Sequence, residues 1–312
     1  MPVTLVPMNR REWLRGAAAL GAGLWLGGAT RGVAGVEQDG AKGGAGAVDP
    51  HRFALFSDTH IWAKRDEVVR GVAMAKNLKQ ACDESLSGDG ARPAAAMICG
   101  DCAYLTGEPG DYAVLVELLQ PLRKAGVPVH MAMGNHDQRA NFWKAFSPAE
   151  GAKMLVDQRQ VSIVPSPRAN WFVLDSLDVT NKTPGVCGEK QLAWLSQALD
   201  QHADKPAIVM VHHNPDEREQ PSGLVDTAAL YAALESRKHV KALFFGHTHN
   251  WSVTERKGLH LINLPPTAYV FGEGKPNGWV DVQLLEGGMK LQLRCLDANH
   301  ALHNKTHDLR WT

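Results

Sequence analysis

The sequence predicts an α/β fold in one large domain, and three observations support this. Short apolar runs alternate with longer amphipathic segments from residue 51 to residue 245, as expected for a sheet that is buried on both faces. After residue 250 only strand-like segments remain, joined by glycine-containing turns. The chain has 312 residues, 44% of them hydrophobic, which is enough to build a large core.

The individual elements follow from apolar runs and from helical spacing. The predicted strands are 53–56, 94–98, 127–133, 171–174, 207–211 and 242–245, followed by 252–256, 259–263, 279–285 and 290–296. The predicted helices are 66–86, 111–124, 188–199 and 226–235. Gly126 ends the second helix, because glycine readily takes the backbone conformation that closes a helix. The order is therefore α/β first and β later.

Residues 1–35 are predicted to be an export signal rather than part of the fold. They carry a net charge of +3, from Arg10, Arg11, Arg15 and Arg31 against Glu12. The basic region precedes an apolar, glycine-rich stretch that is too short for a stable membrane span. The paired arginines resemble the bacterial twin-arginine (Tat) signal, which predicts contact with the Tat export machinery and a periplasmic or secreted protein.

The glycine-rich residues 36–50 are predicted to be a flexible linker, so that the catalytic domain spans residues 51–312. An uncleaved amphipathic anchor is the alternative for the first segment. The formal net charge of the whole chain is zero, which argues against a nucleic-acid-binding surface. The sequence contains no pattern that indicates an oligomeric state.

Five short polar blocks occur in one order along the chain, most of them directly after an apolar run. They are Asp58-Thr59-His60, Gly100-Asp101, Gly134-Asn135-His136-Asp137, His212-His213 and Gly246-His247-Thr248-His249. Strand ends can converge on one rim of a sheet, and these side chains offer nitrogen and oxygen ligands there. Imidazole suits Zn, Fe, Mn or Cu, and carboxylate suits the harder of these metals. The blocks therefore predict a metal site, and its size indicates two ions.

A pair of divalent ions about 3.5–4 Å apart can clamp a phosphate and activate a water between them. This chemistry needs one carboxylate that bridges both ions, and Asp101, at the end of the second strand, is the natural bridge. Asp58 and His60 are expected to point the same way because residues i and i+2 share a strand face. His247 and His249 have the same spacing.

These blocks are similar to those of the calcineurin-like metallophosphoesterase superfamily, over nearly all of residues 51–263. Within it, the run 134–139, the triplet Leu174-Asp175-Ser176 and the run 191–195 resemble the bacterial class III cyclic-nucleotide phosphodiesterase branch. The resemblance implies a four-layer α/β/β/α sandwich and two divalent or mixed-valence ions of Fe, Mn or Zn.

The resemblance also implies a role for each block. The implied metal ligands are Asp58, His60 and His249 for the first ion, Asp101 as the bridge, and Asn135, His212 and His247 for the second. His136 would protonate the leaving alkoxide or steady the phosphate, and Asp137 would orient His136. Arg139 is a candidate phosphate contact, because a guanidinium can bind two phosphate oxygens; a solvated helix residue is the open alternative.

Two positions, Asn214 and Tyr104, depart from the simplest interpretation of these motifs. Asn214 stands where many relatives have proline, so we interpret His213 as a residue behind the ligands rather than a ligand. Tyr104 matches a tyrosine that binds iron in purple acid phosphatases. The first block of those enzymes has no histidine after the aspartate, whereas this chain has His60 there. We therefore predict that Tyr104 packs in the pocket and is not a metal ligand.

The five cysteines, at 82, 99, 102, 187 and 295, have no regular spacing and predict no disulfide framework. The Cys99-x-x-Cys102 pattern leaves open a redox pair or a buried Cys99 beside a metal-binding Asp101. Residues 138–170 form an insert directly after a site block. It either contributes to substrate choice or is a purely structural connection.

These observations predict an exported hydrolase that acts on a small phosphoester, with a phosphodiester as the leading substrate class. The reaction would be in-line attack by a hydroxide bound to both metals. The alternatives are a phosphomonoesterase that uses the same site and a catalytically silent binding protein. The complete ligand set argues against the binding protein.

Overall fold

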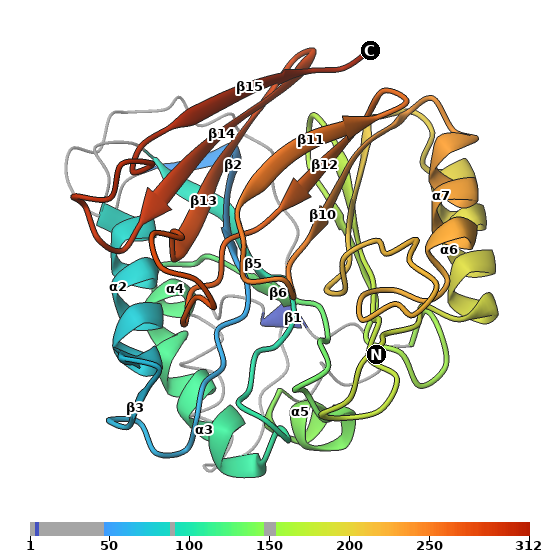
Figure 1. Cartoon of the computed structure of the whole chain (residues 1–312). Helices are drawn as coiled ribbons and strands as arrows, with labels where there is room; N and C mark the ends of the chain where they lie inside the picture. Colours follow the sequence, from blue (N-terminus) through green and yellow to red (C-terminus); the bar gives the residue numbers. More distant parts are fainter. Residues whose placement is uncertain (1–3, 6–46, 88–90, 147–153) are drawn as a thin grey trace, which may run out of the picture.

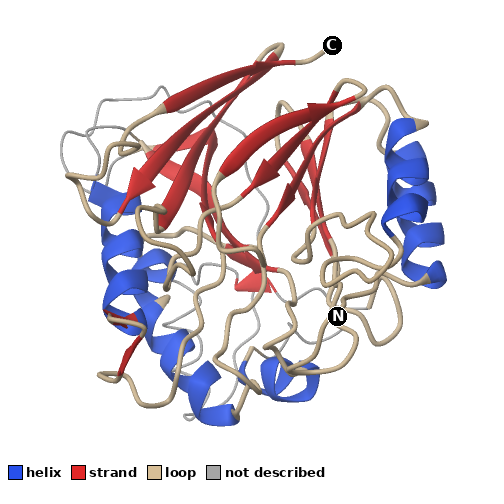
Figure 2. Ribbon diagram, viewed as in Figure 1, coloured by secondary structure: helices blue, strands red, loops and turns tan. Residues whose placement is uncertain are grey.

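The computed structural model describes residues 4–5, 47–87, 91–146 and 154–312. Two β-sheets face each other in the middle of the molecule, and helices cover the outer face of each sheet (Figures 1 and 2). This is the predicted four-layer α/β/β/α arrangement. Most of the predicted export signal (1–35) and linker (36–50) lies outside the described residues.

The first sheet has seven strands in the order β1-β6-β5-β2-β13-β14-β15. They are β1 (Thr4–Leu5), β6 (Val129–Met131), β5 (Arg92–Ile98), β2 (Val48–Phe56), β13 (Gly278–Leu285), β14 (Gly288–Cys295) and β15 (Thr306–Arg310). Strands β2, β5 and β6 run parallel to one another, and β13 to β15 pair antiparallel. The carboxyl ends of three strands therefore lie along one edge of this sheet.

The second sheet has six strands in the order β11-β12-β10-β9-β8-β7. They are β11 (Ser252–Arg256), β12 (Leu259–Asn263), β10 (Val240–Phe245), β9 (Ala207–Met210), β8 (Asn170–Val173) and β7 (Ser162–Pro165). Strands β8, β9, β10 and β12 are parallel, and the two edge strands are antiparallel to their neighbours. Four more strand ends therefore lie along one edge of this sheet.

Helices α2 (Met74–Ser87), α3 (Pro109–Leu118) and α4 (Gln120–Lys124) cover the first sheet, and α6 (Glu189–Gln201) and α7 (Thr227–Glu235) cover the second (Figure 1). Alternate residues of β2 pack into two different hydrophobic cores. Phe53 and Leu55 pack between the sheets, whereas Ala54 and Phe56 pack against α2 to α4. Burial on both faces explains why the predicted strands are continuous apolar runs.

The predicted helix 66–86 is wrong in its first part. A small hairpin, β3 (Val68–Val69) and β4 (Val72–Ala73), precedes α2. Its two turn residues, Arg70 and Gly71, have φ values of 50° and 82°, as a tight hairpin turn requires. The apolar spacing of this segment is compatible with a helix, but these backbone conformations are not.

The predicted helix 111–124 is divided at Leu119 into α3 and α4. Pro121 lies at the start of α4, and without a backbone N–H it cannot continue the hydrogen-bond ladder of α3. Strands β7 and β15 were not predicted. His307 lies in β15.

The N-terminal boundary also differs from the prediction. Strand β2 begins at Val48 and pairs with β5 from that residue, so residues 48–50 of the predicted linker are part of the sheet. Thr4–Leu5, inside the predicted signal, forms β1 on the edge of the first sheet next to β6. In the part of the chain that the structure describes, no helix combines the length and the apolar character needed to span a membrane.

Candidate metal centre

The five polar blocks meet where the parallel strands of the two sheets end. Asp58 and His60 follow β2, Asp101 follows β5, and Asn135 follows β6, all from the first sheet. From the second sheet, His212 follows β9, and His247 and His249 follow β10. Backbone hydrogen bonds continue the strand pairing into these loops, for example from His60 N to Asp101 O at 2.9 Å and from Gly246 N to His212 O at 2.9 Å.

Asp58, His60 and His249 form the first group of candidate ligands. The Nε2 atoms of His60 and His249 lie 3.1 Å apart, and His249 Nε2 lies 3.4 Å from Asp58 Oδ1. All three side chains are buried. These are the three residues expected to hold the first ion.

Asp101 lies between the first group and the next. Its Oδ2 atom is 3.8 Å from His60 Nε2 and 3.3 Å from His212 Nε2. It forms a candidate group with Asp58 and His212 and another with His60 and His136. Its second oxygen, Oδ1, accepts the backbone N–H of His136 at 2.8 Å, which fixes the orientation of the carboxylate. This is the position that a bridging ligand needs.

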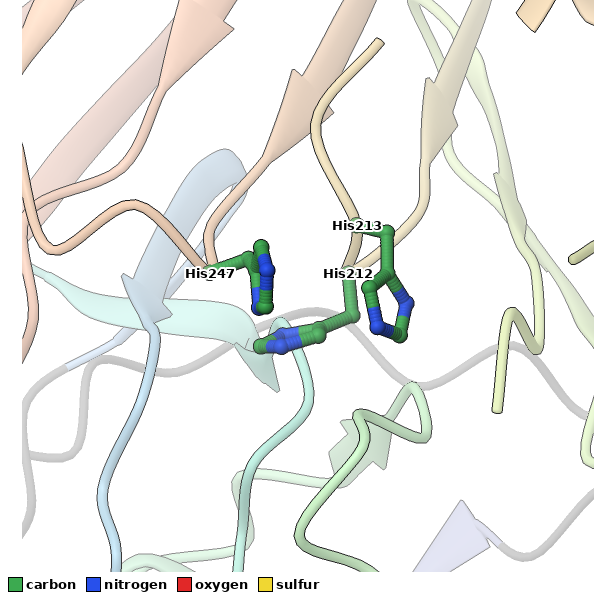
Figure 3. A group of neighbouring side chains, drawn as sticks. All are labelled: His212, His213 and His247. Carbon is green, nitrogen blue, oxygen red and sulfur yellow. The ribbon is translucent and has the colours of Figure 1, made fainter. Parts of the chain in front are cut away.

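His212, His213 and His247 form a further group, shown in Figure 3. The rings of His212 and His247 have centroids 5.3 Å apart, and those of His213 and His247 are 4.7 Å apart. Nδ1 of His213 is hydrogen bonded to Ser176 Oγ at 2.8 Å, whereas its Nε2 is buried without a hydrogen-bond partner. The geometry thus adds His213, which we interpreted as lying behind the ligands, to the candidate ligands.

Backbone carbonyls hold the second ring nitrogen of three histidines. His212 Nδ1 is 2.7 Å from Cys99 O, His249 Nδ1 is 2.6 Å from Tyr269 O, and His247 Nε2 is 3.1 Å from Ser222 O. A donated N–H at each of these atoms fixes the tautomer and leaves the other ring nitrogen as an acceptor for a metal.

Five of the candidate ligands have a left-handed backbone conformation. The φ values are 49° for Asp58, 45° for His60, 45° for Asp101, 67° for His247 and 53° for His249. Such a conformation costs a non-glycine residue roughly 1–3 kcal/mol and occurs mostly at functional sites. The expectation that strand alternation orients the pairs Asp58/His60 and His247/His249 is therefore wrong, because β2 and β10 end before them and the turns orient their side chains.

Two glycines make room for the carboxylates. A Cβ atom on Gly134 would lie 2.2 Å from Asp101 Oδ1, and one on Gly246 would lie 2.6 Å from Asp58 Oδ2. Neither distance is compatible with a side chain. The Gly-Asn-His-Asp and Gly-His-Thr-His blocks therefore begin with glycine because a carboxylate packs against the backbone at that point.

Burial and neighbouring charge shift the ionisation of the site in opposite directions. Burial lowers the pKa of His60 to about 3, so this imidazole is neutral at pH 7 and can bind a metal. Burial also disfavours a charged His212, but the adjacent Asp101 outweighs it and raises the pKa of His212 to about 9. Burial opposes ionisation of Asp101, yet His212 and His60 hold its pKa well below the ordinary value.

The donor set fits two divalent ions. Buried imidazoles and two carboxylates supply nitrogen and oxygen ligands, and Asn135 Oδ1 and His212 Nε2 are buried without a hydrogen-bond partner. An unpaired buried polar atom costs about 1–3 kcal/mol, which a metal bond at that atom would offset. Asp58, His60 and His249 would hold one ion, Asn135, His212 and His247 the other, with Asp101 between them.

His136 lies at the open side of the cluster. Its ring centroid is 5.2 Å from that of His60, and the residue is half-buried. Its Nδ1 atom bonds to the carbonyl of Leu105 at 2.8 Å, so Nε2 is the atom available to a substrate. This position agrees with the expected role at the leaving group.

Asp137 does not orient His136 as we expected. Its carboxylate is fully buried and accepts the backbone N–H groups of Cys102, Ala103 and Gly134 and the hydroxyl of Tyr112. Four donors saturate the carboxylate, and none of them belongs to the His136 ring. Asp137 therefore joins the loop after β5 to the loop after β6, and it sets the positions of Asp101 and Asn135.

The guanidinium of Arg139 pairs with Asp175. Its Nε and Nη2 atoms donate to the two oxygens of Asp175 at 2.7 and 2.8 Å, and Nη2 also bonds to the carbonyl of Leu177. Arg139 is therefore not a solvated helix residue, and the fork of donors that would bind two phosphate oxygens is engaged by Asp175. Its helix, α5 (Arg139–Ala145), lies at the start of the insert (138–170).

The insert contributes two further contacts to Asp175. Arg159 lies 3.8 Å from its carboxylate, and Gln160 N donates to it at 2.8 Å. Gln191 belongs to the run 191–195 that resembles the phosphodiesterase branch. Its side chain accepts the backbone N–H of Asp175 and donates to the carbonyl of Asp175. This motif therefore fixes the loop after β8, and the described parts of the insert (138–146 and 154–170) help to hold it in place.

The structure also shows the surroundings of Tyr104 and of the Cys99-x-x-Cys102 pattern. Tyr104 packs against Trp62 with ring centroids 5.1 Å apart, and its ring lies 6.5 Å from that of His60. Both thiols of the Cys99-x-x-Cys102 pattern are free and buried, and they contact different carbonyls, of Val211 and Ala132. Burial raises the pKa of each thiol well above its usual value, which argues against a reactive redox pair.

Sequence reasoning missed Tyr269 and Phe271, in the loop after β12. The Tyr269 ring stacks on His60 at 5.1 Å, and the Phe271 ring stacks on His249 at 4.2 Å. Strand β12 is parallel to β10 and ends at the same edge. The rule that predicted the five blocks could therefore have identified this loop, although none of its side chains belongs to a candidate ligand group.

Residues 51–251 match a family model that is described as Calcineurin-like phosphoesterase. The chain is 24% identical over 221 residues to the glycerophosphodiester phosphodiesterase GpdQ of Enterobacter lignolyticus (strain SCF1), covering 70% of this chain and 77% of that protein. It is 26% identical over 232 residues to the 3',5'-cyclic adenosine monophosphate phosphodiesterase CpdA of Pseudomonas aeruginosa, covering 72% and 79%.

The fold is similar to that of a solved dimetal phosphatase from Danio rerio, with a TM-score of 0.66 and 16% identity. The match covers 85% of this chain and 100% of that one. At this identity the similarity concerns the fold.

Replacing Asp101 with alanine is expected to remove both metal ions, because its carboxylate is the one that lies between the two ligand groups. Metal content per chain, measured by mass spectrometry after loading with Mn²⁺ and desalting, should fall from two to near zero. Asp178→Ala, at an exposed aspartate, is the control and should keep both. Two ions retained in Asp101→Ala would contradict the bridging position.

Asp137→Ala is expected to destabilise the fold by about 3 kcal/mol or more, because three backbone N–H groups and the Tyr112 hydroxyl lose their acceptor. Urea unfolding of the metal-free protein measures this loss separately from metal binding. Asp137→Asn keeps an acceptor oxygen and should lose less. An unchanged urea midpoint in Asp137→Ala would show that the carboxylate does not hold these loops.

Proposed function

Because this chain belongs to the calcineurin-like phosphoesterase family, and so is a hydrolase that acts on ester bonds, we propose that it hydrolyses phosphodiesters at the metal centre. The observation that carries the proposal is Asp101, which lies between two groups of nitrogen and oxygen ligands. Two similar proteins are named as phosphodiesterases, which supports this class of substrate.

Two divalent ions, when bound, would neutralise phosphate charge and activate a water for in-line attack. The ligands contain imidazole, carboxylate and amide groups and no thiolate, a set that suits Mn, Fe or Zn. Asp101 and the histidines around it would fix the positions of the ions. Their burial excludes water from one side of the site and strengthens the interactions of the centre with a phosphate.

His136 is the residue of this chain that we propose to act on the substrate. Its backbone N–H is held by Asp101 Oδ1, and its ring Nδ1 is held by the carbonyl of Leu105. In its doubly protonated form, with Nδ1–H donated to Leu105, His136 can therefore give the Nε2 proton to the departing alkoxide or donate a hydrogen bond to a phosphate oxygen. A poor leaving group such as an alkoxide needs this proton most.

The ion pair of Arg139 with Asp175 favours a diester over a monoester. A phosphomonoester carries close to two negative charges at pH 7, whereas a diester carries one. The guanidinium of Arg139, which the sequence offered as a phosphate contact, donates from Nε and Nη2 to the two oxygens of Asp175. Phosphomonoester hydrolysis remains the second candidate for the same centre.

A substrate panel tests the proposal directly. After chelation and reloading with Mn²⁺, Zn²⁺ or Fe²⁺, the protein should hydrolyse bis-p-nitrophenyl phosphate faster than p-nitrophenyl phosphate, and cyclic AMP should be included as a natural diester. Faster hydrolysis of the monoester would favour a phosphatase. Two bound metals without turnover of any ester would indicate a binding protein instead.

His136→Ala is expected to keep both metals and to lose turnover of the diester by about 10²–10⁴-fold, the usual contribution of a positioned acid or base. The measurement pairs kcat with metal content in the same sample. His307→Ala, in β15 and outside the candidate ligand groups, is the matched control and should retain turnover. Full activity of His136→Ala would remove this residue from the mechanism.

A further inference from the structure

Arg70 is an exposed arginine in the two-residue turn between β3 and β4. Its guanidinium carbon lies 5.1 Å from the centre of the Phe271 ring and 5.5 Å from that of Tyr269. No acidic side chain in the described part of the chain makes an ion pair with it, in contrast to Arg65 nearby, which pairs with Glu117 at 3.1 Å. The positive charge of Arg70 is therefore not neutralised locally.

The two rings under Arg70 are in contact with the metal centre. Phe271 stacks on His249 with centroids 4.2 Å apart and planes inclined by 28°, and Tyr269 stacks on His60 at 5.1 Å and 20°. One layer of aromatic rings therefore separates the guanidinium from two candidate ligands of the first metal. An ester arm of a substrate at this metal would need to pass only this one layer of rings to reach Arg70.

The loop that carries both rings is fixed to the site by hydrogen bonds. Thr267 N and Ala268 N donate to the carbonyls of Ser57 and Asp58 at 2.7 and 3.1 Å. The amide of Asn77, in α2, donates to the carbonyls of Thr267 and Ala268 at 3.2 and 3.0 Å. The aromatic surface is therefore held in place independently of Arg70.

The N–H groups of the guanidinium remain available, because within the described residues no group accepts a hydrogen bond from the Arg70 side chain. Its contacts are with the rings, which attract the cation without using its N–H groups as hydrogen-bond donors to an anion would. Phe271 is 59% exposed although the adjacent His249 is 3% exposed, so this surface faces solvent at the rim of the centre. An anion in solution could therefore reach the outward N–H groups.

We propose that Arg70, seated on Phe271 and Tyr269, binds a second anionic group on the substrate and so determines specificity. The preferred substrates would be phosphodiesters in which one ester arm carries a carboxylate or a further phosphate. This inference rests on the proposed function, because it assigns the recognition of one arm of a diester hydrolysed at the same centre.

The test needs a variant that removes the charge and keeps the turn. Arg70 has a φ of 50° and is followed by Gly71 at 82°. Asparagine tolerates this conformation well, and Asn-Gly is the preferred pair for such a turn, so Arg70→Asn is the suitable substitution. Arg65→Asn is the matched control, because it removes an exposed arginine that is already paired with Glu117.

Two chromogenic diesters with arms of equal carbon number, one ending in a carboxylate and the other in a methyl group, provide the measurement: 3-carboxypropyl p-nitrophenyl phosphate and n-butyl p-nitrophenyl phosphate. The Mn²⁺-loaded wild type should prefer the carboxylate ester. Arg70→Asn should lower kcat/KM for this ester about tenfold, through KM, and change the butyl ester less than twofold. Arg65→Asn should change neither, and the preference should shrink at high salt.

Calorimetric titration with 4-phosphonobutyrate and butylphosphonate supplies a readout that does not depend on turnover. The wild type should bind 4-phosphonobutyrate more tightly, and Arg70→Asn should lose this difference. Equal losses for both esters, or no preference in the wild type, would overturn the role of Arg70 while leaving the hydrolase intact. If the wild type cleaves neither ester, the proposed function fails, and the inference fails with it.

Discussion

The structure of the site depends on burying the carboxylate of Asp101 between two groups of histidines. Burial of a charge is costly unless charged partners and hydrogen bonds compensate it. Here the backbone N–H of His136 fixes one oxygen, and His60 and His212 approach the other. This arrangement also requires left-handed turns at the ends of β2, β5 and β10. It further requires that residue 134 be a glycine, because a Cβ atom there would overlap the Asp101 carboxylate.

Two other buried carboxylates hold the loops that present the ligands. Asp137 joins the loops after β5 and β6, and Asp175 joins the loop after β8 to Arg139 and to Gln160. Both carboxylates use their hydrogen-bonding capacity on the protein itself. A chain that places four carboxylates at one edge of its sheets therefore uses two of them, Asp58 and Asp101, in the ligand groups and the other two for support.

The sequence was sufficient to predict the sheets, the five blocks and their convergence, because apolar strands and the polar residues that follow them have a strong local pattern. It was not sufficient for Asp137 and Arg139, which lie two and four residues after Asn135. Their roles depend on which donors other loops bring to them, and no local pattern contains that information. The hairpin before α2 was missed for a related reason, since Val68, Val69 and Val72 also suit a helix face.

The candidate centre and its rim differ in how they constrain the sequence, and this explains which parts could be predicted. The inner ligands are buried, so their chemical type, their order and the glycines beside them are restricted together, and these restrictions are visible as motifs. The rim formed by Arg70 and Phe271 is exposed and needs only a cation, a ring and a fixed loop. Many sequences satisfy this condition. The inner residues therefore identify the class of reaction, whereas the choice of substrate depends on exposed side chains that only the three-dimensional structure brings together.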